Sequence, residues 1–372
     1  MHNSPKRILH VFSSLELGGA QRRFIEYLHR SKAGYVHNVY AMDGNYTALE
    51  LVKDLEAPDG GAQLVPKGNT LAAITACRRM LKKNRPDLLI TYNWGAVEWA
   101  VANKFFSICP TIHIQDGFTE EEQSKELWAR QMFRRFAYKG CEAVVVPSKT
   151  LEQKVQDDWH ISENKLQFIP NGIDLERFQK TADESVLKSY GIDPAKRIIG
   201  TIAGLRPEKN VGRLIEAYCH IEDRIPNTQL VIIGDGVGMS ALKMLAERVC
   251  TKDSVIFTGN ISHPELVLPC FELFALSSDT EQMPISVIEA MAAGLPIVST
   301  NVGDIAQMVS TENKPYVAGK DAQTLTNNIS LLLETKKSSQ EIGTANQNKA
   351  KINYAIDQMV HRYDTLFADC IN

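Results

Sequence analysis

Short apolar runs alternate with longer amphipathic stretches along the whole chain. Most of the short runs are apolar throughout, as expected of strands that helices cover on both faces. Strands that alternate with helices predict right-handed βαβ units and parallel sheets, so the predicted fold class is α/β. The predicted strands are residues 7–14, 36–42, 87–93, 111–116, 142–148, 166–171, 197–205, 228–235, 254–260, 273–278 and 296–301.

The strand series is interrupted by the polar stretch QKTADESVLKSYGIDPAKR at 179–197, after which an apolar strand begins again. One core rarely extends beyond about 250–300 residues, so a chain of 372 residues is expected to hold two domains. We place them at 1–178 and 179–355, as two doubly wound domains facing a central cleft. A C-terminal helix at about 356–372 is expected to pack back on the first domain. The polar region 336–351 is expected to form a loosely packed surface helix or loop.

Composition and charge exclude several classes of protein. Hydrophobic residues make up 44% and charged residues 23%, which is typical of a globular protein. A net charge of −3 gives no support to nucleic-acid binding, which usually needs a basic domain. The seven cysteines form no C-x-x-C pair, so reduced thiols are favoured over disulfides or a zinc site. The N-terminus resembles a first strand more than a signal peptide, and no run of about 18 apolar residues occurs, so we expect a cytoplasmic protein.

The most informative segment is SSDTEQMPISVIEAMAAGLPIVSTNVGD at 277–304. Pro284 suits the first turn of a helix, where its missing N–H has no cost. Gly294 suits the position just after the end of that helix, and Pro296 opens the next strand. Free N–H groups at a helix start favour an anion such as a diphosphate. The predicted donors lie around Met283, Pro284, Ile285 and Ser286.

Two acids, Glu281 and Glu289, flank this predicted helix start. A carboxylate offers about four lone-pair sites and can accept hydrogen bonds from a pair of sugar hydroxyls. One acid could bind a ribose and the other a donor sugar. The alternative is a helix whose acids are only stabilised by the helix dipole. The pair alone does not decide between these interpretations.

Further candidates follow other predicted strands. Gly18 and Gly19 lie between the first strand and the first helix, where glycine lets the backbone approach a ligand closely, or where a plain turn needs it. Arg206 and Lys209 follow the strand that begins at 197 and would be read alone as a solvated charged loop. Gly234 opens the pattern G-x-G-x-G. Because methionine stands where the dinucleotide fingerprint has its last glycine, a nicotinamide site is a weak interpretation.

These motifs together resemble the family 4 glycosyltransferases, a large group of retaining enzymes with the GT-B fold. The two glutamates and the AMAAGLPIV that follows them are similar to the family signature. The resemblance extends over most of the chain, and its motifs occur in the family's order. The other matching segments are LELGGAQRRFIEYL (15–28), FIPNGIDLERF (168–178), TIAGLRPEKN (201–210) and VIIGDGVGMSALKMLAERV (231–249).

The resemblance implies roles for individual residues. Glu289 is expected to bind the nucleotide ribose, and Glu281 hydroxyls of the donor sugar. Arg206 and Lys209 are expected to hold the diphosphate, on which charge develops as the glycosidic bond breaks. The family often has an arginine where this chain has Gly204, so Arg206 is expected to supply the guanidinium from two residues later. Gly18, Gly19 and Gly234 are expected near the donor.

The catalytic position of the N-terminal domain is left open between two residues of the segment 111–122. Many relatives carry a histidine near this strand end that faces the donor sugar. Asp116, just before Gly117, matches the usual position, and His113 matches an earlier histidine of some relatives. Because a strand alternates faces, the two side chains need not point the same way, and a lone histidine in an apolar strand is more often structural.

The resemblance implies retaining transfer from a UDP-sugar or GDP-sugar without a protein nucleophile. The acceptor hydroxyl would attack on the face from which the diphosphate leaves, and orientation and charge would do the catalysis. No D-x-D triplet occurs, so we expect no metal and no other cofactor. The competing hypotheses are another GT-B enzyme (a sugar-nucleotide epimerase or phosphorylase) and a non-catalytic nucleotide-sugar-binding subunit.

The acceptor is expected to be a glycan or a lipid-linked molecule, as in polysaccharide or glycolipid biosynthesis. The stretch LWARQMFRRFAYKG at 127–140 is basic and aromatic. It could lie on an anionic membrane surface, which would place the protein peripherally at the inner face of a membrane. The simpler interpretation is an amphipathic helix that packs on its sheet.

Overall fold

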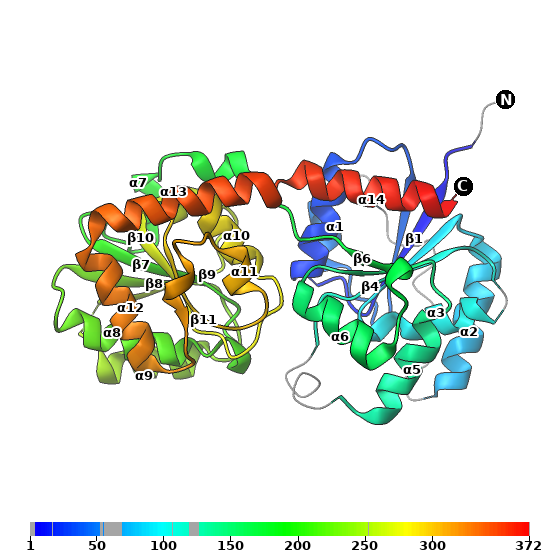
Figure 1. The fold of residues 1–372 in the computed structure, drawn as a ribbon, viewed down its shortest axis with the longest axis horizontal. Coiled ribbons are helices and arrows are strands. Elements are labelled where there is room, and N and C mark those ends of the chain that lie inside the picture. The colour runs from blue at the N-terminus through cyan, green and yellow to red at the C-terminus, as the bar shows by residue number, and fades with distance from the viewer. Residues whose placement is uncertain are drawn as a thin grey trace. The chain divides into compact units, whose positions relative to one another are not determined.

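The computed structural model describes residues 4–16, 18–52, 55, 69–105, 107–118, 126–251 and 253–371. The chain divides into two compact units. Unit 1 comprises Met1–Asn171 with Ile356–Asn372, and unit 2 comprises Gly172–Ala355. Each unit has a six-stranded parallel sheet with helices on both of its faces (Figure 1). The α/β class and the parallel sheets predicted from the sequence are confirmed.

The sheet of unit 1 has the strand order β2-β1-β3-β4-β5-β6. Strand β2 therefore lies on one side of β1, and strands β3 to β6 follow in order on the other side. The carboxyl ends of β1 and β3 are the switch point, where open α/β sheets bind ligands. The strands are β1 (Arg7–Phe12), β2 (Val36–Ala41), β3 (Leu88–Tyr92), β4 (Thr111–Ile114), β5 (Ala143–Val146) and β6 (Leu166–Phe168).

Helices α1 and α14 cover one face of this sheet, and α2, α3, α5 and α6 cover the other. The C-terminal helix α14 (red in Figure 1) packs on α1, with the rings of Tyr27 and Phe367 5.5 Å apart. The helices are α1 (Gly19–Arg30), α2 (Thr70–Asn84), α3 (Val97–Lys104), α5 (Trp128–Tyr138), α6 (Lys149–Trp159) and α14 (Ile356–Ile371), with short 3₁₀ helices η1 (Thr47–Leu51), η2 (Trp94–Ala96) and η3 (Glu163–Lys165).

Unit 2 repeats this plan with the order β12-β11-β10-β7-β8-β9, so its switch point lies between β7 and β10. One face is covered by α10, α11 and α13, and the other by α8, α9 and α12. The strands are β7 (Arg197–Ile202), β8 (Thr228–Ile233), β9 (Val255–Gly259), β10 (Phe271–Leu276), β11 (Ile297–Thr300) and β12 (Val317–Ala318). The helices are α7 (Glu184–Ser189), α8 (Val211–Glu222), α9 (Met239–Val249), α10 (Ile285–Ala292), α11 (Ile305–Met308), α12 (Ala322–Glu334) and α13 (Lys336–Asn353), with η4 (Leu175–Gln179), η5 (Pro207–Lys209), η6 (Pro264–Leu266), η7 (Leu268–Cys270) and η8 (Lys314–Tyr316).

The structure differs from the sequence-based expectations in two places. The chain leaves unit 1 at Asn171, because Leu175 and Phe178 belong to the core of unit 2. The region 336–351 is a well-packed helix, which corrects the expectation of loose packing. A Cβ on Gly343 would lie 2.0 Å from the carbonyl oxygen of Gly294, so α13 needs glycine there to approach the end of α10.

Candidate active site

The turn between β10 and α10 has the geometry that the sequence predicts. Pro284 directly precedes α10, and Gly294 follows its end with φ +75°. Within the described residues, the N–H groups of Ile285 and Ser286 have no hydrogen-bond acceptor, whereas Met283 is buried beneath them. The first turn of an α-helix leaves such N–H groups unsatisfied and positively polarised. N–H groups of this kind favour an anion, and here they lie at the carboxyl end of β10.

Glu281 and Lys209 meet in a close ion pair beside this turn. Lys209 Nζ lies 2.6 Å from Glu281 Oε1, and the Ser278 hydroxyl donates to the same oxygen at 2.8 Å. The side chain of Lys209 is 16% exposed, and that of Glu281 is 9% exposed. The structure therefore joins a residue predicted for the diphosphate to one predicted for the donor sugar, and encloses both.

Glu289 lies slightly more than one turn into α10 and is buried. Its expected contact with a nucleotide ribose stays a prediction. A buried carboxylate has to be satisfied by hydrogen-bond donors, and hydroxyls of a bound ligand can supply them.

Arg206, in contrast, extends into solvent. Its side chain is 61% exposed, and its Nε lies 3.0 Å from a carboxylate oxygen of Glu208. Exposed pairs of this kind are worth about 0–1 kcal/mol, so Arg206 can change partners at little cost. The structure thus offers one exposed cation and one enclosed cation at the same edge.

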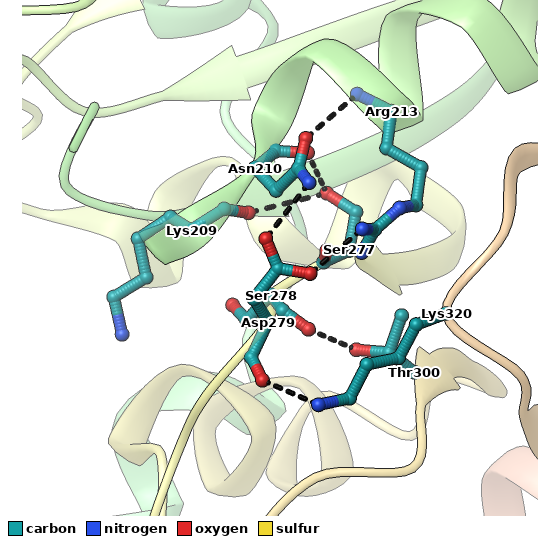
Figure 2. Close-up of polar contacts among 8 residues, drawn as sticks. All are labelled: Lys209, Asn210, Arg213, Ser277, Ser278, Asp279, Thr300 and Lys320. Atoms are coloured by element: carbon teal, nitrogen blue, oxygen red, sulfur yellow. Dashed lines mark hydrogen bonds and ion pairs between the residues drawn. The ribbon is translucent and has the colours of Figure 1, made fainter. Parts of the chain in front are cut away.

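A second ion-pair network, which the sequence did not indicate, joins the two loops of the switch point (Figure 2). Asp279 accepts from Arg213 Nη2 at 2.7 Å and from Asn210 Nδ2 at 2.8 Å, and Lys320 Nζ donates to its backbone oxygen at 2.7 Å. Burial alone would raise the pKa of Asp279, but the hydrogen bonds from Arg213 and Asn210 hold it below the usual value. The network fixes the loop that follows β7 to the loop that follows β10.

At two positions in or beside these loops, backbone segments approach each other so closely that only glycine fits. A Cβ on Gly303, where φ is +52°, would lie 2.5 Å from the backbone oxygen of Glu281. A Cβ on Gly234, where φ is +137°, would lie 2.0 Å from the backbone oxygen of Ala203. Packing therefore accounts for glycine at 234, and its contact with a donor stays a prediction.

In unit 1, Asp116 lies just beyond the end of β4 and is held by a buried arginine. Arg23 of α1 pairs through Nη1 with Asp116 Oδ1 and donates to Asn171 Oδ1 at 3.2 Å. Asn93, at the end of β3, accepts from the Asp116 N–H at 2.8 Å. Burial opposes the charge of Arg23, but the Asp116 carboxylate outweighs burial and raises the arginine pKa. Asp116 keeps 18% of its side chain exposed, so it can reach a substrate.

His113, one of the two residues between which the catalytic position was left open, is a core residue. It is fully buried, its Nδ1 lies 2.9 Å from Thr91 Oγ1, and its ring stacks on Tyr138 at 3.7 Å. Burial lowers its pKa to about 3. His113 contacts Tyr138 of α5 on one side of the sheet, whereas Asp116, beyond the end of β4, pairs with Arg23 of α1 on the other side. Residues 119–122 of the same segment lie outside the described residues.

Gly18 and Gly19 lie at the start of α1, near the switch point of unit 1. A Cβ on Gly18 would meet only the end of the Gln21 side chain, at 3.0 Å, and a Cβ on Gly19 would meet nothing within 4 Å. Neither glycine is required by packing, so their predicted approach to a ligand stays a prediction.

Comparison with known families decides the classification. The model described as Glycosyltransferase Family 4 matches residues 17–177, and the model described as Glycosyl transferases group 1 matches residues 182–349.

The chain belongs to the group 1 glycosyltransferases of family 4.

Several curated glycosyltransferases are similar to this glycosyltransferase. The UDP-Gal:alpha-D-GlcNAc-diphosphoundecaprenol alpha-1,3-galactosyltransferase of Escherichia coli is 24% identical over 65% of this chain and 65% of its own length. The alpha-monoglucosyldiacylglycerol synthase of Acholeplasma laidlawii is 26% identical over 63% of this chain and 60% of its own. The chain thus spans less than two thirds of the length of these two relatives.

Solved structures show the same fold. The crystal structure of Anabaena Alr3699/HepE in complex with UDP and glucose superposes with a TM-score of 0.82 at 17% identity, over 98% of this chain and 100% of that one. The GT-B fold predicted from the sequence is therefore confirmed for this glycosyltransferase.

Helix α5 of the glycosyltransferase has both a packed face and an exposed apolar face. Arg134, Ala137 and Tyr138 are buried, as the simpler interpretation expected. Trp128 is nevertheless 73% exposed. Among the residues that the structure describes, no helix combines the length and apolar character needed to cross a bilayer. The other exposed apolar side chains here are Leu127, Met132 and Phe136. Phe105, which directly follows α3, is also exposed, and its ring lies 5.8 Å from that of Phe136.

Proposed function

We propose that this glycosyltransferase is a retaining enzyme that transfers a sugar from a UDP-sugar or GDP-sugar to a glycan or a lipid-linked acceptor. The observation that carries the proposal is the convergence of Glu281, Lys209 and the start of α10 at the switch point of unit 2. This combination offers hydrogen-bond acceptors for hydroxyls and donors for a diphosphate within one edge of one sheet. The Escherichia coli relative, whose name gives UDP-Gal as its donor, and the Anabaena neighbour solved with UDP and glucose support a nucleotide-sugar donor.

In the proposed complex, Glu289 accepts from the ribose hydroxyls and Glu281 from the hydroxyls of the donor sugar. The diphosphate lies on the N–H groups of Ile285 and Ser286, with Arg206 and Lys209 beside it. These groups stabilise the charge that develops on the leaving diphosphate. Removing one such group is expected to reduce turnover on the order of 10²–10³-fold, by analogy with oxyanion-hole donors.

The proposed transfer is a front-face substitution. The bond from the sugar C1 to the diphosphate oxygen breaks, and a bond from C1 to the acceptor oxygen forms on the same face. The acceptor proton passes to a phosphate oxygen of the leaving nucleoside diphosphate, so no protein nucleophile is required. Asp116, with its accessible carboxylate, is proposed to accept a hydrogen bond from a substrate hydroxyl in unit 1.

We also propose that transfer needs no metal ion, because Arg206 and Lys209 offer the positive charge that a metal would supply to a diphosphate. Turnover should be the same in EDTA as in Mg²⁺. Activity that is lost in EDTA and restored by Mg²⁺ would reject this part of the proposal.

Thermal unfolding with UDP, GDP and their sugars tests the donor site. A ligand at about 100 times its Kd stabilises the folded state by about 2.7 kcal/mol, which gives a clear shift. Glu289→Ala should remove the shift, whereas Glu281→Ala should reduce turnover and sugar discrimination more than nucleotide binding. Glu216→Ala, at an exposed acid on α8, is the matched control. Unchanged binding and turnover in both site variants would reject the assignment.

We further propose that α5 contacts an anionic membrane surface, which would bring the enzyme to a lipid-linked acceptor. The apolar face of α5 carries Trp128, Met132 and Phe136 at helical spacing. The helix has arginines and no acid. Lys104, next to α5, places its ammonium 3.9 Å from the centre of the Phe136 ring. Aromatic side chains bordered by cations fit the interface of an anionic bilayer.

Cosedimentation with vesicles tests this contact. Binding to vesicles that contain phosphatidylglycerol should exceed binding to pure phosphatidylcholine and should weaken with salt. Trp128→Ser with Phe136→Ser should reduce it at least tenfold, since partition energy scales with apolar area. The control is Ile352→Ser on α13, where the side chain is 69% exposed, against 73% for Trp128 and 43% for Phe136. Equal binding of all variants would reject α5 as the contact.

A further inference from the structure

Both cations proposed for the diphosphate are already paired with acids. Arg206 pairs with Glu208 at 3.0 Å, and Lys209 pairs with Glu281 at 2.6 Å. An incoming diphosphate therefore meets no unpaired charge at these two positions and must compete with a carboxylate for each cation. The two competitions differ, because one pair is exposed and the other is enclosed.

Separation of the Arg206 pair leaves Glu208 in contact with water, which replaces the lost hydrogen bond. Separation of the Lys209 pair has a different consequence. Among the residues that the structure describes, Glu281 would keep only the hydroxyl of Ser278 as a donor, in a position that water reaches poorly. A poorly hydrated carboxylate without its cation is strongly unfavourable. Lys209 is thus available to a phosphate only when another donor takes its place on Glu281.

A nucleotide sugar can supply that replacement. Lys209 and Ser278 both approach Oε1, and within the described residues Oε2 of Glu281 has no hydrogen-bond donor. A sugar hydroxyl can donate to Oε2 first, and a second can then occupy the position that Lys209 leaves on Oε1. A nucleoside diphosphate without a sugar can attract Lys209 but leaves Glu281 unsatisfied.

We propose that the Lys209–Glu281 ion pair makes the site select the nucleotide sugar over the free nucleoside diphosphate. The proposal rests on the proposed function and assigns Glu281 a second role, as an internal competitor for Lys209. When the sugar has left for the acceptor, Glu281 loses its hydroxyl donors and recovers Lys209. The site then holds the product nucleoside diphosphate less tightly, which favours its release.

Calorimetric binding of UDP and UDP-glucose tests this selection, with GDP and GDP-mannose as a second pair. Glu281→Gln keeps the shape but removes the charge that competes for Lys209. It should tighten binding of the free nucleoside diphosphate about tenfold. That factor in Kd corresponds to about 1.4 kcal/mol of binding free energy that competition from Glu281 no longer removes. It should weaken binding of the nucleotide sugar, so that the preference for the sugar disappears. Glu208→Gln, at the exposed pair, should leave that preference unchanged.

Lys209→Met provides a second variant with the opposite expectation. It should weaken binding of both the nucleoside diphosphate and the nucleotide sugar. In the double variant Lys209→Met with Glu281→Gln, the tighter binding of the free nucleoside diphosphate should disappear, because no cation remains to be released. If Glu281→Gln binds UDP and GDP no more tightly than the unmodified protein, the selection proposal is wrong while the donor site stands. If the unmodified protein binds none of the four probes, the proposed function fails, and the selection proposal fails with it.

Discussion

The two switch points of this glycosyltransferase lie at the carboxyl edges of six-stranded parallel sheets and carry different chemistry. At the β7/β10 edge of unit 2, Arg206, Lys209 and a helix start offer positive charge and N–H donors. At the carboxyl edge of unit 1, Asp116 keeps its carboxylate 18% exposed, whereas its partner Arg23 is buried. Unit 2 is suited to an anion, and unit 1 is suited to a hydroxyl.

The ion pairs of the two edges also differ in permanence. Arg23 is buried and bonded to both Asp116 and Asn171, so its pairing is part of the fold. Arg206 is exposed, and Lys209 can be released by a ligand that satisfies Glu281. Burial distinguishes the two arginines: Arg23, 4% exposed, is held within the fold, whereas Arg206, 61% exposed, can exchange partners at little cost.

The largest expected effect follows from breaking the permanent pair. Arg23→Met should destabilise unit 1 by about 3–5 kcal/mol, because it leaves Asp116 without its buried partner. All four tryptophans lie in unit 1, so tryptophan fluorescence during urea unfolding reports this unit alone. Adding Asp116→Asn should recover part of the loss, since both charges are then gone. A cost below about 1 kcal/mol would show that the pair is not structural.

A smaller effect is expected where backbone contact positions Glu281. Gly303→Ala should reduce turnover on the order of 10²-fold, because a Cβ there would displace the loop that carries Glu281, and displacement of about 1 Å has that cost. Gly191→Ala is the matched control, since Gly191 has a φ of +75° and a Cβ there would meet nothing within 4 Å. Gly191→Ala should lose about 1–2 kcal/mol of stability through its left-handed backbone alone. Gly303→Ala should lose more, because of the backbone clash, and it alone should lose turnover.

The next largest expected effect is that low pH destabilises unit 1 more than unit 2. His113 has a pKa of about 3 in the folded protein and 6.5 as its ordinary value, so the unfolded chain takes up the proton first. Stability is full above pH 6.5 and falls as the pH decreases toward 3, by roughly 2 kcal/mol at pH 5 for this one group. His37, with a pKa lowered to about 4 by burial, acts in the same direction.

Both histidines of unit 2, His220 and His263, are exposed. The urea midpoint followed by tryptophan fluorescence should therefore decrease between pH 7 and pH 5, while unfolding of unit 2 changes little. A midpoint that does not move with pH would contradict the buried, uncharged state of His113.

The smallest effect is expected at the exchangeable pair. Arg206→Met should change the free energy of unfolding by less than about 1 kcal/mol, because its ion pair is exposed. Binding of a nucleoside diphosphate should nevertheless weaken. A large loss of stability would place Arg206 among the structural residues and remove the contrast with Arg23.

Much of this arrangement could be predicted from the sequence, because it depends on local patterns. Apolar runs indicate the strands, and Pro284 and Gly294 indicate the ends of α10. The two-residue strand β12 was not predicted, because Val317–Ala318 is too short to give a periodic pattern. The boundary was misplaced because the chain crosses between units before the strand pattern changes, so that Phe178 packs into unit 2.

Contacts between distant residues could not be predicted. Nothing local distinguishes Arg23 from Arg22, although only Arg23 turns inward to Asp116. Lys209 and Glu281 were each expected near a ligand, but their bond to each other depends on how two loops pack. His113 was left open because both a core and a catalytic histidine fit an apolar strand, and burial decides only in three dimensions.

The central claim is that the donor binds at the switch point of unit 2. A crystal structure of the protein with UDP or GDP tests it most directly. The account predicts the diphosphate on the N–H groups of Ile285 and Ser286 with the ribose on Glu289. Electron density for the nucleotide at the β1/β3 edge of unit 1, or away from Glu289, would contradict it.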